Sequence, residues 1–286
     1  MVSDDLGCDR SRQWRLAICC GLPRSGSTLQ YQLAAEIVES AGAGRALGWI
    51  GAASVDDVIE QLPRGKVGVV KVHHFQQLHG VTRADAGGSL RLIHSYRDLR
   101  DVAVSLSRLS GRSFRDIVVA ADVERMIADS IQWESCESVM LSRYEDFVGD
   151  VGREAGRIAA HLDLDLPVDL LDHFVDHFSL ERQRDRTAEL RSDSIGYDPT
   201  TLLHRGHIGS GAAEQWRSLS MVERAYLERV AGDWLSRHQY ALSTHSYQRQ
   251  LAAARYLTRY IDRARNHRSK GTLAAAVRRR FIDRFR

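Results

Sequence analysis

One short segment of the sequence is suited to binding an anion. Residues 21–28 read Gly-Leu-Pro-Arg-Ser-Gly-Ser-Thr and lie between an apolar run and a helical pattern. A glycine-bearing turn at a helix N-terminus attracts phosphate, because free amides and about half a positive charge gather there. Gly26 would admit phosphate oxygens close to the backbone, and Ser27 and Thr28 add hydroxyl donors. The segment predicts a phosphate-binding loop, with a plain strand-to-helix turn as the alternative.

The same segment departs from the loop of nucleotide triphosphatases. The spacing of Gly21 and Gly26 matches the pattern GxxxxGK[ST], but Ser27 occupies the lysine position. A triphosphatase would lose its γ-phosphate clamp there. A basic group is present three residues earlier, at Arg24.

A second anion-binding candidate follows the apolar run 90–95. Arg97 comes directly after this expected strand, at the edge where open α/β sheets bind ligands, and Ser105 follows eight residues later. Eight helical residues span about 12 Å, so the two side chains share one phosphate only if the chain between them folds back. An ordinary charged helix start is the alternative for this segment.

A basic strand end supplies the candidates for proton transfer. Lys71 and His73 alternate along the chain and are expected on one side of a strand, whereas His74 points elsewhere. A histidine suits removal of a hydroxyl proton near neutral pH. Taken alone, two histidines at a strand end are more often structural than catalytic, and Lys71 could simply be solvated. His73, His74 and His79 lack the spacing of metal ligands, so no metal is expected.

The elements that must position these residues follow from apolar periodicity. Short apolar runs alternate with longer helical patterns, which predicts an α/β fold: one three-layer P-loop-type domain with a central parallel sheet flanked by helices. Beyond residue 166 the strand signals fade into helices at 168–178 and 221–237. The expected strands are 16–22, 67–72, 90–95 and 139–142, and the expected earlier helices are 28–40, 98–110, 114–134 and 152–162.

Charge separates a body from a tail. The 286 residues carry a net charge of +3, but residues 245–286 hold twelve basic and two acidic residues, which leaves the body at −7. We therefore predict a domain at 14–244 and a basic helical C-terminal extension at 245–286. Apolar residues at four-residue spacing in 273–285 suit either a helix on an anionic membrane surface or one packed on the body.

Composition narrows the class of protein further. The proportions, 43% hydrophobic and 27% charged, are those of a folded globular chain. No apolar run approaches the ~20 residues of a membrane span, and the polar start lacks the apolar stretch of a signal peptide. The sequence predicts a cytoplasmic protein with no nucleic-acid partner, in contact with a membrane only if the tail provides it.

Taken together, four segments resemble those of the sulfotransferases that use 3′-phosphoadenosine 5′-phosphosulfate (PAPS). Residues 23–28 and 96–105 are similar to the two nucleotide-binding signatures of that family. Residues 143–147, Arg-Tyr-Glu-Asp-Phe, resemble its YEDL segment, and His207-Ile208-Gly209 with Trp216-Arg217 resembles its late loop. The similarity covers about 16–240 and implies the same fold and cofactor.

The resemblance also implies residue roles. The phosphate loop would hold the 5′-phosphosulfate, Arg97 and Ser105 the 3′-phosphate, and Tyr144 would lie near the adenine. Arg205 is expected to cover the 3′-phosphate, although Arg-Gly-His-Ile-Gly departs from the family's Arg-Lys-Gly. The family's Lys-x-His segment favours His73 as the base, with Lys71 and Arg24 stabilising the leaving phosphate. The loop residues are Arg24, Ser25, Gly26, Ser27 and Thr28.

The implied reaction is transfer of a sulfuryl group from PAPS to a hydroxyl of a carbohydrate or small molecule, without a metal. Few aromatic residues stand in the segments expected to form the acceptor pocket, which favours a polar acceptor. The rival functions are a P-loop kinase acting with ATP and a non-catalytic nucleotide-binding protein.

Overall fold

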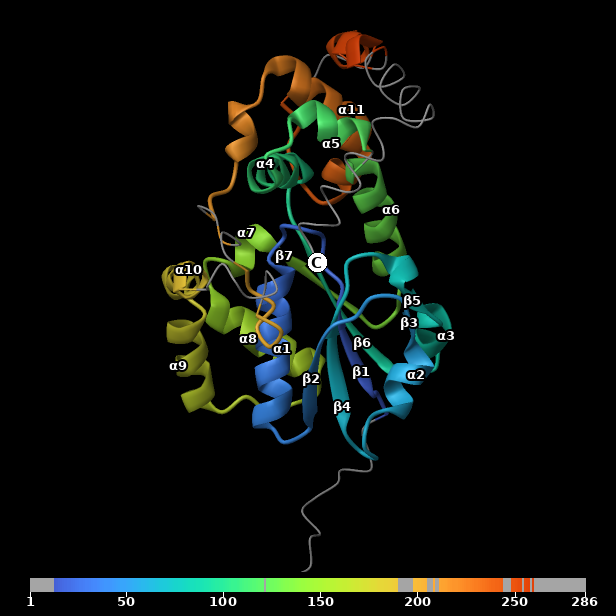
Figure 1. The fold of residues 1–286 in the computed structure, drawn as a ribbon, viewed down its shortest axis with the longest axis vertical. Helices are drawn as coiled ribbons and strands as arrows, with labels where there is room; N and C mark the ends of the chain where they lie inside the picture. Colours follow the sequence, from blue (N-terminus) through green and yellow to red (C-terminus); the bar gives the residue numbers. More distant parts are fainter. Residues whose placement is uncertain are drawn as a thin grey trace, which may run out of the picture. The chain divides into compact units, whose positions relative to one another are not determined.

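The computed structural model describes residues 13–120, 122–189, 198–204, 208, 211–243, 248–253, 255–257 and 259. The chain divides into two compact units (Figure 1). Unit 1 comprises 1–96, 129–183 and 199–203, and unit 2 comprises 97–128, 184–198 and 204–286.

Unit 1 is built on a five-stranded sheet in which every neighbouring pair of strands is parallel. The strand order is β2-β4-β1-β6-β7, so β1 lies in the centre. The carboxyl ends of β1, β4 and β6 therefore meet at one edge, where the chain enters the segments that hold Gly21, His73 and Arg97. The strands are β1 Leu16–Cys19, β2 Gly44–Trp49, β4 Val67–Lys71, β6 Leu90–Tyr96 and β7 Val139–Arg143.

Alternation along the central strand produces two cores. Ala17 and Cys19 belong to one buried cluster with side chains of α1, α8 and α9, whereas Leu16, Ile18 and Cys20 belong to another with side chains of α2 and α3. Successive residues of a strand point to opposite faces, and helices cover both faces here (Figure 1). The helices are α1 Ser27–Ser40, α2 Val55–Glu60, α3 Val81–Ala86, α7 Tyr144–Phe147, α8 Val151–His161 and α9 Val168–His177.

Unit 2 is helical. Its helix α4 contacts α5, α11 and the short 3₁₀ helix η2. Two further helices, α6 and α10, contain residues of both units. The bounds are α4 Leu99–Ser110, α5 Phe114–Val119, α6 Asp122–Glu134, α10 Leu180–Glu189, η2 Gln215–Ser218 and α11 Met221–Arg237.

The predicted α/β class and the four predicted strands are confirmed, but the first strand ends at Cys19 and not at residue 22, and several other details were wrong. The expected helix 114–134 is two helices, since α5 ends at Val119 and α6 begins at Asp122. The Asp122 carboxylate forms an ion pair with Arg112 at 2.8 Å. The strand β2 was missed, since its sequence Gly-Arg-Ala-Leu-Gly-Trp has two glycines and one β-favouring residue. The short strands β3 (Ala53–Ser54) and β5 (Leu78–His79) and the 3₁₀ helix η1 (Phe75–Gln77) were not predicted either.

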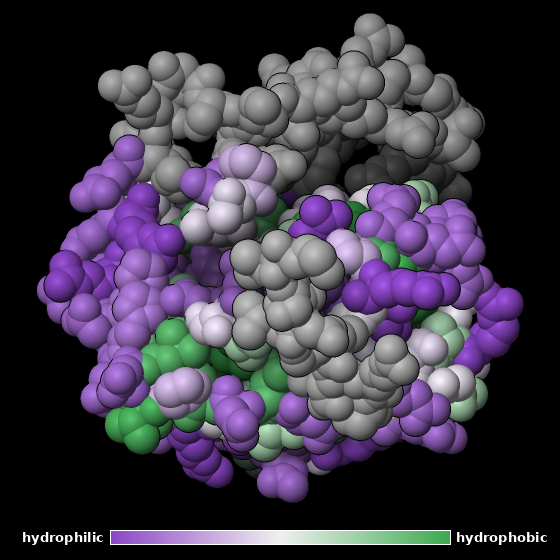
Figure 2. All heavy atoms as spheres, turned by 90° about the horizontal axis from the view of Figure 1, so that it is seen from below, coloured by the Kyte–Doolittle hydropathy of each residue, from purple (hydrophilic) through white to green (hydrophobic). Residues whose placement is uncertain are grey.

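The boundaries 14–244 and 245–286 stay a prediction. Residues 261–286, with most of the basic tail, lie outside those that the structure describes. Among the described residues, no helix is long and apolar enough to cross a membrane. The face drawn in Figure 2 is mostly hydrophilic where it is described, with a green apolar patch at its lower left.

Candidate active site

The segment after β1 forms a tight loop around two residues with positive φ. Arg24 has φ 64° and Gly26 has φ 79°. Such a conformation is unusual for arginine, and strain of this kind gathers at ligand-binding loops. The hydroxyl of Ser25 is fully buried, within 2.6 Å of the Leu22 carbonyl and 2.8 Å of the Ser95 hydroxyl. Ser25 therefore fixes the loop to β6 through its side chain.

Gly26 has a packing role as well as a conformational one. A Cβ placed there would lie 2.7 Å from Phe147 and 3.0 Å from Tyr144. The rings of Tyr144 and Phe147 themselves meet edge to face, with centroids 5.7 Å apart. The structure thus brings Tyr144 against the phosphate loop, within unit 1.

The first turn of α1 presents the features of an anion site. Its N-cap, Gly26, has no side chain to accept from the helix amides, and no acidic residue lies in the first turn. The ammonium of Lys71 donates to the Thr28 hydroxyl at 2.8 Å, so a cation sits at this helix N-terminus. Burial, with a smaller contribution from the nearby charge of Arg24, lowers the pKa of Lys71 to about 8. A bound anion would stabilise the protonated form of Lys71.

His73 is held against the same loop. Its Nδ1 lies 2.7 Å from the carbonyl oxygen of Gly21. A carbonyl can only accept, so Nδ1 carries the hydrogen and the lone pair of the neutral ring lies on Nε2. Burial, followed by the charge of Lys71, lowers the pKa of His73 well below its usual value. The ring is therefore neutral near pH 7 and presents Nε2 as a base.

Trp49, at the end of β2, lies near two predicted catalytic groups: Lys71, the last residue of β4, and His73, two residues after it. Its ring centroid lies 5.0 Å from that of His73, and the Lys71 ammonium lies 5.5 Å from the same ring. The residue is 39% exposed. Because β2 was not predicted, the pairing of Trp49 with Lys71 across neighbouring strands could not be predicted either.

In unit 2, Arg97 and Ser105 are both buried, with 4% and 1% exposure. An Arg97 Nη2 hydrogen is donated to the Ala212 carbonyl at 2.8 Å, and the same atom lies 3.5 Å from Asp101. The guanidinium is thus ordered by its own unit before any ligand binds. Ser105 lies in the second turn of α4, which begins regularly at Leu99 with the Asp98 side chain as N-cap.

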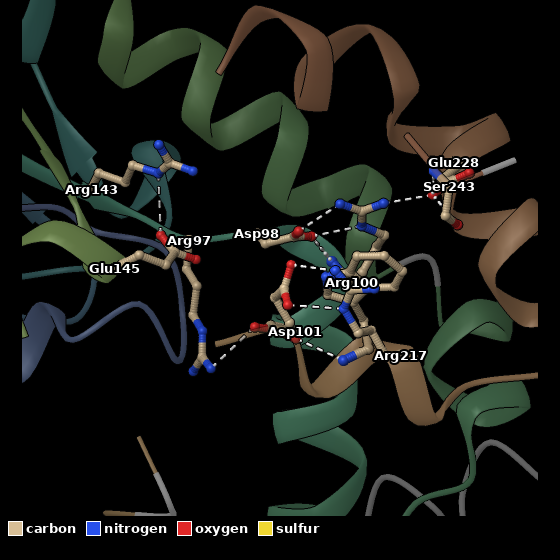
Figure 3. Close-up of polar contacts among 11 residues, drawn as sticks. Arg97, Asp98, Arg100, Asp101, Arg143, Glu145, Arg217, Glu228 and Ser243 are labelled. Atoms are coloured by element: carbon tan, nitrogen blue, oxygen red, sulfur yellow. Dashed lines mark hydrogen bonds and ion pairs between the residues drawn. The ribbon is translucent and has the colours of Figure 1, made fainter. Parts of the chain in front are cut away.

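The charges that follow Arg97 are not the exposed helix start considered as an alternative. Arg100 is 1% exposed and pairs with Asp98 at 2.7 Å and Glu228 at 2.5 Å (Figure 3). The Arg100 guanidinium lies 3.9 Å from the centre of the Trp216 ring. The backbone N–H of Trp216 donates to the Asp101 carboxylate at 2.8 Å. A buried network therefore joins the start of α4 to η2 and α11, and it gives the Trp216-Arg217 segment a structural role.

The predicted roles of the late-loop residues stay a prediction, whereas His74 points away from His73's loop contact, as expected. Arg205, His207 and Gly209 lie outside the described residues. His74 turns to Asp129, with Nδ1 to Oδ2 at 2.8 Å. No group of three or more potential metal ligands occurs within the described ranges.

Solved structures show which fold this is. Retinol dehydratase with retinol and PAP gives a TM-score of 0.55 at 17% identity, covering 78% of this chain and 82% of that one. Mouse sulfotransferase SULT7A1 with PAP gives a TM-score of 0.54 at 12% identity, covering 86% of this chain and 88% of that one. Retinol dehydratase with androsterone and PAP gives a TM-score of 0.56 at 16% identity, covering 83% of this chain and 84% of that one. No family profile and no curated protein matches the sequence.

The chain therefore has the P-loop α/β fold of the sulfotransferases. At these identities the similarity establishes the fold, which agrees with the resemblance found in the motifs. What the site does must be argued from its own residues.

Proposed function

We propose that the protein transfers a sulfuryl group from PAPS to a hydroxyl of an acceptor. One observation carries the proposal: the hydrogen bond from His73 to Gly21 fixes a neutral imidazole to the first residue of the phosphate loop. A base and an anion site are thereby joined, as transfer from a phosphosulfate to a hydroxyl requires. The PAP-bound neighbours of the same fold support PAPS as the donor.

In the proposed step, Nε2 of His73 takes the proton of the acceptor hydroxyl while its oxygen bonds to sulfur. The bond between sulfur and the phosphate oxygen breaks, and the leaving group is 3′-phosphoadenosine 5′-phosphate (PAP). Lys71 and Arg24 offset the charge that grows on it, aided by the first amides of α1. Electrostatic stabilisation of this kind supplies a large share of the rate enhancement in many enzymes.

The remaining cofactor contacts are proposals that rest on the sequence resemblance. Ser27 and Thr28 would bind the 5′-phosphosulfate, Arg97 and Ser105 the 3′-phosphate, and Tyr144 would lie near the adenine. Arg205 would cover the 3′-phosphate. No metal is required in this scheme, since the cationic groups are supplied by side chains.

A nucleotide comparison tests the donor. We expect PAP to raise the melting temperature of the protein, and ATP with Mg²⁺ to leave it nearly unchanged, because the lysine of a triphosphate clamp is replaced by Ser27. A larger shift with ATP and Mg²⁺ would favour the kinase. Incubation with radiolabelled PAPS and cell extract then tests transfer: PAP binding without any labelled acceptor would favour the non-catalytic nucleotide-binding protein.

Contact of the basic tail with an anionic membrane is a separate proposal, supported by the charge of 245–286 alone. The same segment could instead pack on the body.

A further inference from the structure

His74 and Asp129 form an imidazole–carboxylate pair directly after the proposed base. Asp129 Oδ2 lies 2.8 Å from His74 Nδ1, and its Oδ1 accepts from the backbone N–H of Phe75 at 3.0 Å. Asp129 is a buried residue whose side chain is 11% exposed, whereas the His74 side chain is 42% exposed. A buried carboxylate therefore fixes a ring that reaches solvent.

This pair decides which nitrogen of His74 can bind a ligand. An ionised carboxylate only accepts, so Nδ1 carries the hydrogen and the neutral ring offers the Nε2 lone pair. Within the described part of the chain, Nε2 of His74 takes part in no hydrogen bond. An exposed acceptor atom with a fixed orientation is thus present and unused by the proposed transfer step.

The helix α6, which supplies Asp129, also contacts the backbone of His73. Trp133, one turn after Asp129 on α6, donates from Nε1 to the His73 carbonyl at 3.2 Å. Gln77 Oε1 accepts from the His74 backbone N–H at 3.1 Å. His74 follows His73 directly in the chain, so the Cα atoms of the two residues are about 3.8 Å apart. An acceptor with several hydroxyls spread over its length could therefore contact both residues.

The charges around His74 select the kind of ligand. A neutral ring on a carboxylate carries a net negative charge, which opposes an anion, while the charges of Lys71 and Arg24, which act on the neighbouring His73, oppose a cation. A neutral hydroxyl that donates to Nε2 is repelled by neither set of charges. The exposed ring of Trp49 beside His73 suits the C–H face of a sugar, because the face of an aromatic ring is negative.

We propose, on the basis of the transfer reaction above, that His74 held by Asp129 is a specificity residue that binds a second hydroxyl of a polyhydroxylated acceptor. The acceptor class is then a sugar or similar polyol. His74 binds and orients it, Asp129 positions His74, and His73 remains the base.

The premise is tested first by the ring nitrogen chemical shifts of His74 in the full chain, measured by NMR. We expect a protonated Nδ1 and an unprotonated Nε2 in the wild type. Asp129→Asn keeps an oxygen for the Phe75 amide but presents an NH₂ group to Nδ1, which moves the hydrogen to Nε2. Protonated Nε2 in the neutral wild-type ring would overturn the proposal.

The role in recognition is tested with two probes, cellobiose and p-nitrophenol, and radiolabelled PAPS. We expect His74→Ala and Asp129→Asn to raise KM for cellobiose about threefold to tenfold, the cost of one hydrogen bond, and to lower the cellobiose-to-phenol ratio of kcat/KM. His79→Gln, an exposed histidine on β5, should leave that ratio unchanged. An equal loss with both probes would show a structural role and overturn the proposal.

Two further outcomes separate this proposal from the proposed function. Transfer to p-nitrophenol but to no disaccharide would overturn the acceptor class and leave the sulfotransferase activity standing. Failure of PAP to bind would overturn the proposed function, while the chemical shifts of His74 would still report on its pairing with Asp129.

Discussion

At the scale of single residues, burial sets the protonation of the two groups that meet at the phosphate loop. It holds His73 neutral and leaves Lys71 with a pKa of about 8, so that both can act near neutral pH, one as a base and the other as a cation. The Gly21 carbonyl then decides which nitrogen of His73 carries the lone pair and would act as the proposed base.

Replacing the base tests this assignment. We expect His73→Asn to lower turnover by on the order of 10² or more, because the amide can still donate to Gly21 but has no Nε2 lone pair. Affinity for PAP, measured by calorimetry, should change little. Turnover equal to that of the wild type would remove His73 from the mechanism.

The pKa of Lys71 predicts a pH dependence of nucleotide binding. Lys71 is protonated below about pH 8 in the free protein, so PAP affinity should be constant there and fall as the pH rises further. The fall should approach tenfold per pH unit, since binding then requires uptake of a proton. Calorimetric titrations between pH 7 and pH 9.5 measure it. The guanidinium of Lys71→Arg stays charged, and an unaltered alkaline fall in that variant would assign the effect elsewhere.

At the scale of elements, the helix start after β6 is organised by buried charge. Arg100 forms ion pairs with Asp98, the N-cap residue of α4, and with Glu228 of α11, and it stacks on Trp216 of η2 (Figure 3). Breaking such a group by removing one member leaves uncompensated buried charges, which costs more than the pair itself contributes. Arg97 is held by the chain just before η2, because its guanidinium donates a hydrogen bond to the Ala212 carbonyl.

Arg100→Leu should therefore lower the free energy of unfolding by about 3–5 kcal/mol, measured by urea denaturation. Arg108→Leu, on the exposed side of the same helix, should change it by less than about 0.5 kcal/mol. Similar effects of the two substitutions would contradict the argument that Arg100 is the buried link.

At the scale of the whole molecule, an acidic body carries an anion site and a strongly basic tail. The body has a net charge of −7, so affinity for a phosphosulfate depends on a few cations placed at the loop and after β6. The tail contributes +10 and lies outside the segments that resemble the cofactor-binding motifs.

A truncation separates these parts. If the tail contacts membranes, deletion of 271–286 should abolish sedimentation of the protein with phosphatidylserine vesicles at low salt and leave PAP binding unchanged. Neutral phosphatidylcholine vesicles serve as the control. Sedimentation of the truncated protein with anionic vesicles would place the contact elsewhere.

The sequence by itself determined the fold class, the phosphate loop and the strand that leads to His73. These features depend on local spacing: alternation marks the strands, and glycines flank the loop at a helix start. The sequence could not reveal β2, whose small residues carry little strand signal, nor the burial of Arg100, whose partner Glu228 lies far away in the chain.

Only the tertiary structure decided how the candidate residues are used. It turned the Ser25 hydroxyl inward, set Trp49 beside His73 and gave His74 a carboxylate partner from α6. Each of these facts depends on residues distant in sequence that meet at the carboxyl edge of the sheet. Spacing along the chain predicts which groups are present, whereas burial and contact between distant segments set their charge, tautomer and orientation.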